Sequence, residues 1–396
     1  MKIKRIVARI ISTILLCFTL VGCDEAIGSY LKNYDWQPEV VENVYYDFYI
    51  IGEESDDIAR RTVNDKLNQT FDDKFHTKIY IHYVDVTAEK SYADVINEVA
   101  DQTPTSAPVG YVNYTYGGKI LLINDYAMMQ TLAPKLSALD KYLEDTDFAK
   151  LNSQLPTTLL SAAEYFGTDG KSMGTLAIPN NRRLGEFKYY VINRDIAENQ
   201  LSFSAQTELL EMTTPEAVKE LTDAADAKGI VNDGATKYFY EISGDYELKA
   251  ELEESGEWIC NIAESPIVTS EIAYASAFGV IASPNKTETV TITKDDGTKV
   301  QEERVVLDFT ERAMEIIYSI NADVTVRNTL QYGVENTNFT RDDKNFVTPL
   351  LSQGSKYNMN IEYTGDVTKA YYFGSEWTPA LAENVKLHNS KSRLPD

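Results

Sequence analysis

Five short segments of the sequence combine aromatic rings with amide, carboxylate or guanidinium groups, the chemistry needed to hold a polar ligand. They are residues 52–55, 113–116, 180–182, 244–246 and 371–377. The candidate ligand-binding residues within them are Glu53, Tyr114, Tyr116, Asn180, Arg182, Asp245, Tyr246 and Trp377. Such groups stack on apolar faces and exchange hydrogen bonds with hydroxyls. Because the chain contains 26 tyrosines, simple packing is the competing interpretation for each ring.

Patterns that would indicate catalysis or metal binding are sparse. The sequence has no Gly-x-Ser-x-Gly elbow, no His-Glu-x-x-His, no Gly-x-x-x-x-Gly-Lys loop and no paired-cysteine motif. His76 and His82 lie six residues apart near a predicted strand, which favours surface histidines. The oxygen-rich stretch 342–345 contains Lys344 and lacks EF-hand spacing. We therefore expect no metal, no cofactor and no catalytic residue.

The first residues indicate export. Residues 1–22 carry four basic and no acidic side chains, and residues 10–20 form an apolar stretch too short to anchor a span. Leu20-Val21-Gly22-Cys23 resembles the bacterial lipobox. In that interpretation residues 1–22 are a lipoprotein signal peptide, Cys23 receives the lipid, and residues 23–40 form a tether. The alternative is an ordinary signal peptide with an incidental cysteine.

Composition excludes several functional classes. The chain has 396 residues with 37 basic and 61 acidic side chains, so its net charge is −24. Removal of residues 1–22 leaves 33 basic and 61 acidic side chains, a net charge of −28. This acidity argues against nucleic-acid binding, which needs a basic face. Once Cys17 is removed and Cys23 is lipidated, only Cys260 remains, so no intramolecular disulfide is expected.

The elements that must position the candidates alternate between strand and helix. Apolar strands are predicted at 45–51, 79–84 and 108–112, with helices at 56–75 and 91–101 between them. That order predicts an α/β layer with parallel strands. A second such region has strands at 187–192 and 238–242 and helices at 214–227 and 246–254. Residues 288–306 predict a two-stranded hairpin insert, and residues 310–320 an amphipathic helix.

Several short passages, in this order, resemble the lipid-anchored extracellular solute-binding proteins of bacterial ABC importers, in the carbohydrate-type, family 1-like group. They are the lipobox, Asp169–Lys171 with Ala177–Pro179, Tyr189–Ile196, Thr214–Leu221 ending at Lys228-Gly229, Ser276–Lys286, and Met314–Ile317 with Leu330–Glu335. Each match is short, and their shared order over most of the chain gives the resemblance its specificity.

The resemblance implies an α/β, two-lobe periplasmic-binding-protein-like fold with an interlobe cleft and crossing segments near 183–186, 273–276 and 336–338. The implied boundaries are lobe 1 at 41–183, lobe 2 at 184–274, a return to lobe 1 at 275–337 and a return to lobe 2 at 338–396. Larger members continue beyond the point at which this chain ends, so the chain is either a truncated product or a shorter variant, and the completeness of the second lobe stays open.

The implied function is capture of a sugar or oligosaccharide at the outer face of the cell membrane for delivery to ABC permease subunits. The resemblance implies a monomeric protein, attached to the membrane through its lipid, that is not an enzyme and does not bind nucleic acid. Two alternatives stay open. A secreted glycan-active enzyme needs only two carboxylates, and an adhesive surface lipoprotein would have no small-molecule cleft.

Overall fold

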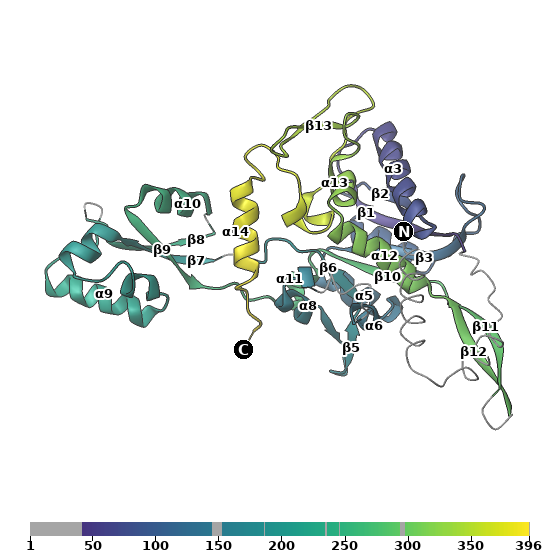
Figure 1. Ribbon diagram of the computed structural model, residues 1–396, viewed down its shortest axis with the longest axis horizontal. Helices are drawn as coiled ribbons and strands as arrows, with labels where there is room; N and C mark the ends of the chain where they lie inside the picture. The colour runs from purple at the N-terminus through teal and green to yellow at the C-terminus, as the bar shows by residue number, and fades with distance from the viewer. Residues whose placement is uncertain are drawn as a thin grey trace, which may run out of the picture. The chain divides into compact units, whose positions relative to one another are not determined.

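A five-stranded sheet organises the first lobe of the protein (Figure 1). The computed structural model describes residues 42–144, 153–185, 187–233, 236–244, 246–293 and 298–395. The strands, in sheet order, are β2 (Thr77–Val84), β1 (Val44–Ile51), β3 (Thr115–Ile123), β10 (Ala277–Ala282) and β6 (Ala177–Pro179). Strand β10 is antiparallel to both neighbours and the other pairs are parallel. The carboxyl ends of β1, β2, β3 and β6 therefore meet at one edge.

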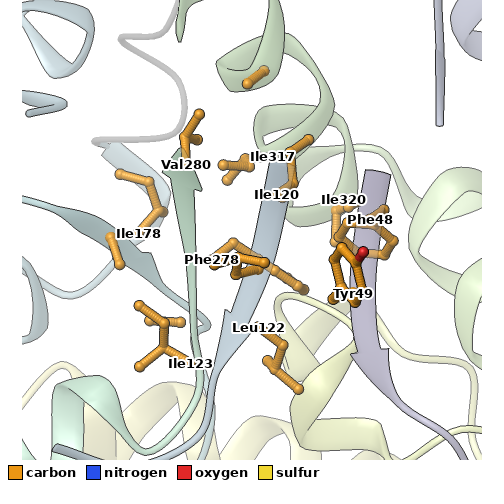
Figure 2. Packing of buried hydrophobic residues seen from close by; sticks show 14 of the residues in the cluster. Phe48, Tyr49, Ile120, Leu122, Ile123, Ile178, Phe278, Val280, Ile317 and Ile320 are labelled. Atoms are coloured by element: carbon orange, nitrogen blue, oxygen red, sulfur yellow. The ribbon is translucent and has the colours of Figure 1, made fainter. Parts of the chain in front are cut away.

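The main core lies between this sheet and its helices (Figure 2). Phe48 of β1 and Phe278 of β10 are fully buried, with ring centroids 5.5 Å apart. Ile317 and Ile320 of α12 (Phe309–Ala322) belong to the same buried cluster. Burying a large apolar side chain contributes about 1.5–3 kcal/mol, so this cluster is a principal source of the stability of the first lobe.

The helices of the first lobe follow the predicted periodicity, with one shift. Helix α3 (Asp57–Phe75) buries Ala59, Val63, Leu67 and Phe71, which lie on one face. Ile58 is 58% exposed, so Ala59 takes the inward position at the start of this helix. The other helical elements are α4 (Tyr92–Ala100), α5 (Tyr126–Leu132), η1 (Ala133–Lys135), α6 (Asp140–Leu143), α8 (Thr157–Ala162), α11 (Ser270–Tyr274) and α13 (Val324–Tyr332).

The third strand differs from the sequence prediction. Residues 108–112 form turns, in which Gly110 has φ +90° and Val109 is 99% exposed. The strand is instead β3, which starts at Thr115 and ends in the buried run Ile120–Ile123. Pro108 and Gly110 interrupt regular pairing, whereas the later run is continuously apolar. Tyr114 and Tyr116 therefore lie at the beginning of this strand and not beyond its end.

A three-stranded antiparallel sheet forms the second lobe. Its order is β8 (Phe239–Ser243), β7 (Lys188–Asn193) and β9 (Trp258–Glu264). Helix α9 (Pro215–Ala227) starts as predicted, because the Thr214 side chain accepts from the backbone amide of Ala217 and Pro215 occupies the first helical turn. The remaining helical elements are η2 (Ile196–Gln200), η3 (Glu208–Glu211) and α10 (Tyr246–Ser255). Buried clusters separate from the main core lie on this sheet, which confirms the expected two-lobe α/β fold.

The chain passes between the lobes after β6 and again after β9. A third passage lies between Phe373 and helix α14 (Pro379–Asn389), not at residues 336–338. Residues beyond 338 stay with the first lobe, since Tyr357 and Met359 are buried in its core. Helix α14 then packs on the second lobe, where Leu381 contacts the cluster of Phe187 and Tyr189.

Three two-stranded hairpins and two short 3-10 turns complete the described chain. Strands β11 (Lys286–Thr293) and β12 (Lys299–Leu307) form the predicted hairpin. The remaining elements are β4 (Glu164–Phe166), β5 (Ser172–Thr175), β13 (Phe339–Arg341), β14 (Val347–Pro349), η4 (Ile361–Tyr363) and η5 (Val367–Lys369). Within the described ranges, no helix combines the length and the apolar composition needed to span a membrane.

Candidate functional site

A hollow of about 280 Å³ lies beyond the carboxyl end of β1. Its rings come from Tyr332, Phe373 and Trp377, and its carboxylates from Glu53 and Glu376. Its amides come from Gln331, Asn358 and Asn360, and Met359 and Ile361 complete the lining. The edge beyond the carboxyl ends of strands is where ligands of α/β folds bind. Two of the eight candidates from the sequence, Glu53 and Trp377, therefore meet in one place.

Arg60 fixes the segment that carries Glu53. Its Nη2 donates to the Glu53 backbone oxygen at 2.8 Å and forms an ion pair with Asp85 at 2.7 Å. Arg60 comes from α3 and Asp85 follows β2, so two elements of the first lobe hold the loop after β1. This tie leaves the Glu53 side chain, which is half-buried, at the wall of the hollow.

The three rings are positioned by backbone contacts around the third passage. The Phe373 amide donates to the Trp377 carbonyl at 2.9 Å, and the Trp377 amide donates to the Phe373 carbonyl at 3.1 Å. Tyr332 donates its hydroxyl to the Tyr371 carbonyl at 3.0 Å. Burial raises the pKa of Tyr332 to about 12, so it stays a neutral donor. Trp377 Nε1 is buried and has no hydrogen-bond partner among the described residues.

A buried guanidinium supports the wall from behind. Arg327 of α13 is fully buried and donates to the Ile361 carbonyl at 3.1 Å and to the side chain of Gln331. Burial lowers the pKa of Arg327 to about 10. Since a buried charge must be hydrogen-bonded to be tolerated, these bonds fix two lining residues in place.

Asn180 and Arg182 do not line the hollow, but both contact Glu362 in η4. Asn180 follows β6 and donates to Ser276 Oγ at 2.9 Å. Arg182 lies 3.7 Å from the Glu362 carboxylate and donates to the Ile272 carbonyl at 3.0 Å. Neither residue lines the hollow, but Glu362 adjoins Ile361, so both contact the segment that does.

Tyr114 and Tyr116 lie at the opposite edge of the first-lobe sheet. Thr115, between them, pairs with Val44 at the start of β1. The Tyr114 hydroxyl donates to the Asp72 carboxylate at 2.8 Å. The Tyr116 ring packs 5.3 Å from that of Tyr45. These contacts are structural, and they follow from the position of β3 described above.

The remaining predicted positions are only partly described. Asp245 and Cys23 lie outside the described residues. Tyr246 is the first residue of α10, and its side chain is outside the described part of the chain. Whether the second lobe adds groups to the hollow therefore stays a prediction. In the ranges that the structure describes, no three His, Cys, Asp or Glu side chains are grouped as metal ligands.

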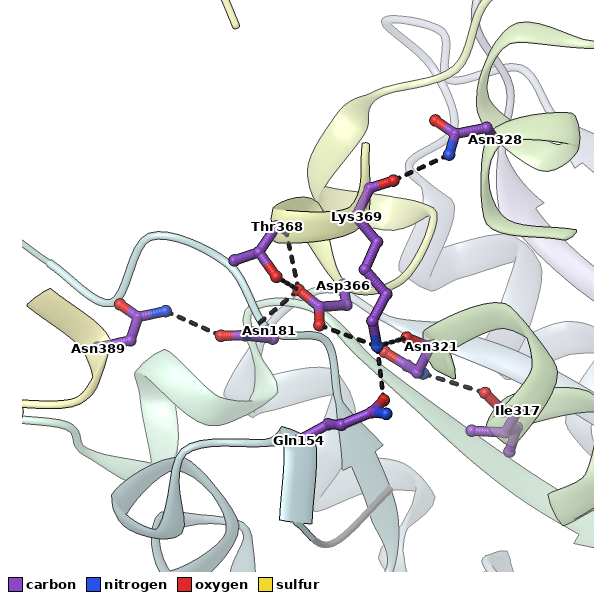
Figure 3. Close-up of polar contacts among 9 residues, drawn as sticks. All are labelled: Gln154, Asn181, Ile317, Asn321, Asn328, Asp366, Thr368, Lys369 and Asn389. Carbon is purple, nitrogen blue, oxygen red and sulfur yellow. Dashed lines mark hydrogen bonds and ion pairs between the residues drawn. The ribbon is translucent and has the colours of Figure 1, made fainter. Parts of the chain in front are cut away.

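A second, larger cavity of about 560 Å³ lies where α8, η5 and α14 approach the first passage. Figure 3 shows the polar network along its wall. Asn181 donates to Asp366 at 3.1 Å and accepts from Asn389 at 2.8 Å. Lys369 donates to Gln154 at 2.5 Å and lies 3.4 Å from Asp366. These contacts join Gln154, Asn181, η5 and Asn389, so the network ties four segments of the chain together.

Sequence reasoning missed several residues of these sites. Phe373 and Glu376 lie within the nominated segment 371–377 but were not chosen, because that segment offered no reason to prefer them over its tyrosines. Gln331 and Tyr332 read as ordinary residues of a helix end. The alternation Asn358-Met359-Asn360 was the available signal, since it places two amides on one side of an extended segment.

Comparison with known proteins gives structural likenesses only. No protein-family model matches the sequence, and no curated protein matches it. The N-glycan transport solute binding protein (NgtS) from Streptococcus pneumoniae aligns with a TM-score of 0.49 and 12% identity, over 89% of this chain and 84% of that chain. Its complex with Man5GlcNAc gives a TM-score of 0.48 and 12% identity, over 89% and 83%.

A HMO binding ABC-transporter associated solute binding protein from Bifidobacterium longum infantis aligns with a TM-score of 0.37 and 10% identity. That alignment covers 88% of this chain and 82% of that chain. The glycans and the transport roles belong to those proteins. The evidence about the ligand of this chain is the chemistry of its own hollow.

Proposed function

We propose that this protein is an extracytoplasmic solute-binding protein that captures a sugar or oligosaccharide in the hollow beyond β1, for import by an ABC transporter. One observation carries the proposal. Glu53 and Trp377, selected from the sequence as ligand-binding residues, come from distant parts of the chain and line the same hollow. Convergence of rings and polar groups at a strand's carboxyl edge is typical of a ligand site.

The lining suits a sugar better than a purely apolar ligand. Sugar rings have apolar C–H faces that pack on aromatic rings, which Trp377, Phe373 and Tyr332 supply. Their hydroxyls need both donors and acceptors, which the amides and the two carboxylates supply.

The two lobes fit a protein that closes around its ligand. Each lobe has its own sheet and buried clusters, and the chain passes between them three times. Hinge closure of two lobes over a ligand is one established form of conformational change. The prediction that Asp245 and Tyr246 contribute from the second lobe belongs to this proposal, because both residues directly follow β8.

Membrane attachment and transport partners extend the proposal. Residues 1–22 are the proposed signal peptide, and Cys23 is the proposed lipidation site at the outer face of the cell membrane. The partners would be ABC permease subunits, and the protein would act as a monomer. Replacing Cys23 by Ser should release the protein from the membrane fraction into the medium. Unchanged membrane association of Cys23→Ser would contradict the lipid anchor.

Calorimetric titration of the protein with Man5GlcNAc and with shorter sugars tests the capture function. We expect binding without turnover, and a loss of about tenfold or more in affinity in Trp377→Ala because the stacking surface is removed. Tyr114→Ala is the matched control, since its ring lies at the opposite edge of the sheet. Binding of peptides in place of sugars would contradict the ligand class, and release of cleaved glycan would instead support a glycan-active enzyme.

A further inference from the structure

Among the described residues, the wall of the hollow carries negative charge only. Glu53 and Glu376 line it, and no lysine, arginine or histidine of the described ranges does. Neither carboxylate forms an ion pair or accepts a hydrogen bond from any of the described residues. A neutral sugar would satisfy these carboxylates through hydroxyl donors, but it would leave both charges uncompensated.

The nearby basic side chains are engaged elsewhere. Arg60 forms its ion pair with Asp85, at 2.7 Å. Lys356 pairs with Glu54, the residue after Glu53, at 2.7 Å. Arg327 is buried, and its guanidinium donates hydrogen bonds to the Gln331 side chain and the Ile361 carbonyl. None of these three groups supplies a positive charge to the interior of the hollow.

The aromatic rings add a second attraction for a cation. A ring face attracts an ammonium group within about 6 Å of its centroid, and tryptophan does so most strongly. Trp377, Phe373 and Tyr332 line the same hollow as the two carboxylates. Aromatic rings and carboxylates lining one site together bind a protonated amine. The net charge of −24 on the whole chain also favours the approach of a cation from solution.

We propose that the hollow selects glycans that carry a protonated amine, such as an unacetylated amino sugar, over the neutral sugars of the same shape. This inference rests on the proposed function and adds a ligand class to it. The ammonium group would lie between Glu53 and Glu376 and against a ring, while the sugar hydroxyls meet the amides of Gln331, Asn358 and Asn360.

The test uses pairs of sugars that differ in one amine for one hydroxyl: glucosamine and glucose, galactosamine and galactose, and the β-1,4-linked disaccharides of glucosamine and of glucose. Affinities are measured by calorimetry at a pH that protonates the amine. We expect the amino member of at least one pair to bind about tenfold more tightly. The preference should shrink when salt is raised, because added ions screen exposed charges.

Glu53→Gln and Glu376→Gln should each reduce the preference without abolishing binding of the neutral sugar. Glu288→Gln is the matched control, because it removes the same charge from an exposed position on β11. Thermal unfolding of each variant verifies that it is folded, and the salt dependence of the unaltered protein needs no variant at all.

The outcomes separate this inference from the function on which it rests. Equal affinity for both members of every pair that binds would refute the selection for amines and leave sugar capture intact. A preference that both Glu53→Gln and Glu376→Gln retain in full would refute the assignment to this hollow. If neither these sugars nor Man5GlcNAc bind, the inference and the proposed function fail together.

Discussion

Protonation of His388 should loosen helix α14 from the second lobe. His388 is 2% exposed, its ring centroid lies 3.9 Å from that of Phe187, and its Nε2 hydrogen-bonds the Tyr189 hydroxyl. Burial, and after it the positive charges of Lys249, Arg183 and Lys391, together lower the pKa of His388 to about 4. The folded protein therefore holds this imidazole neutral.

The size and sign of the effect follow from the two pKa values. The ordinary pKa of histidine is 6.5, against about 4 in the folded protein. Between these values the unfolded chain binds a proton that the folded chain does not, so the free energy of unfolding rises with pH. A difference of about 2.5 pH units corresponds to about 3 kcal/mol. This stability is fully present above pH 6.5 and is lost as the pH falls toward about 4.

Urea unfolding followed by circular dichroism at several pH values measures this loss. Carboxylates titrate in part of the same window, so the comparison is with His388→Gln, which keeps a neutral polar group. The variant should lose about 3 kcal/mol less than the unaltered protein between about pH 7 and pH 4. His76→Asn, at an exposed position with φ 54°, is the control and should leave the pH dependence unchanged. Parallel curves for His388→Gln and the unaltered protein would refute the reasoning.

Three further substitutions test other parts of the structure. Gly118→Ala should lower the free energy of unfolding in urea by about 3 kcal/mol or more, because φ is +122° and the added Cβ would lie 2.2 Å from the Ile281 carbonyl. The control Gly170→Ala, with φ +73° and open space around the added Cβ, should lower it by about 1 kcal/mol. Equal losses of stability in the two variants would contradict the steric argument. Arg327→Ala should lower the free energy of unfolding by about 3 kcal/mol and weaken sugar binding in calorimetry, because the Ile361 carbonyl loses its hydrogen-bond partner. An unchanged affinity for sugar would show that Arg327 does not support the hollow. Asn389→Ala should speed amide exchange in α14 by losing two hydrogen bonds at 2.8 and 2.7 Å, and unchanged exchange would contradict its role at the first passage.

The predicted strands show where local pattern is sufficient. Residues 45–51 are apolar except for Asp47 and end at Gly52, and the structure has β1 there with seven of its eight residues buried. Residues 108–112 also contain valines and a tyrosine, yet they form turns. In β3 the apolar run Ile120–Ile123 is preceded by Gly117, Gly118 and Lys119, residues that are uncommon in strands, so the sequence did not indicate where the strand begins. Glycines are tolerated there because the backbones of β3 and β10 approach closely at Gly118.

The candidate site shows where local pattern is insufficient. The rule that ligands bind beyond the carboxyl ends of strands selected Glu53, which lines the hollow, because β1 was correctly located. The same rule placed Tyr114 and Tyr116 wrongly, because the strand they were thought to follow begins at Thr115. An error of a few residues in one strand moved both rings to the other edge of the sheet.

The sequence by itself determined the alternation of strands and helices and the acidic charge balance, and its resemblance to a known family implied the two lobes. The alternation depends on apolar periodicity and on turn or capping residues, which act over a few neighbouring positions. Only the tertiary structure decided that Glu53 and Trp377 share a hollow with Glu376, and that Arg327 supports its wall. Residues from distant parts of the chain meet there because packing of α13 and of the segment after Tyr357 on the core brings them together. No local sequence pattern predicts which of these distant residues come into contact.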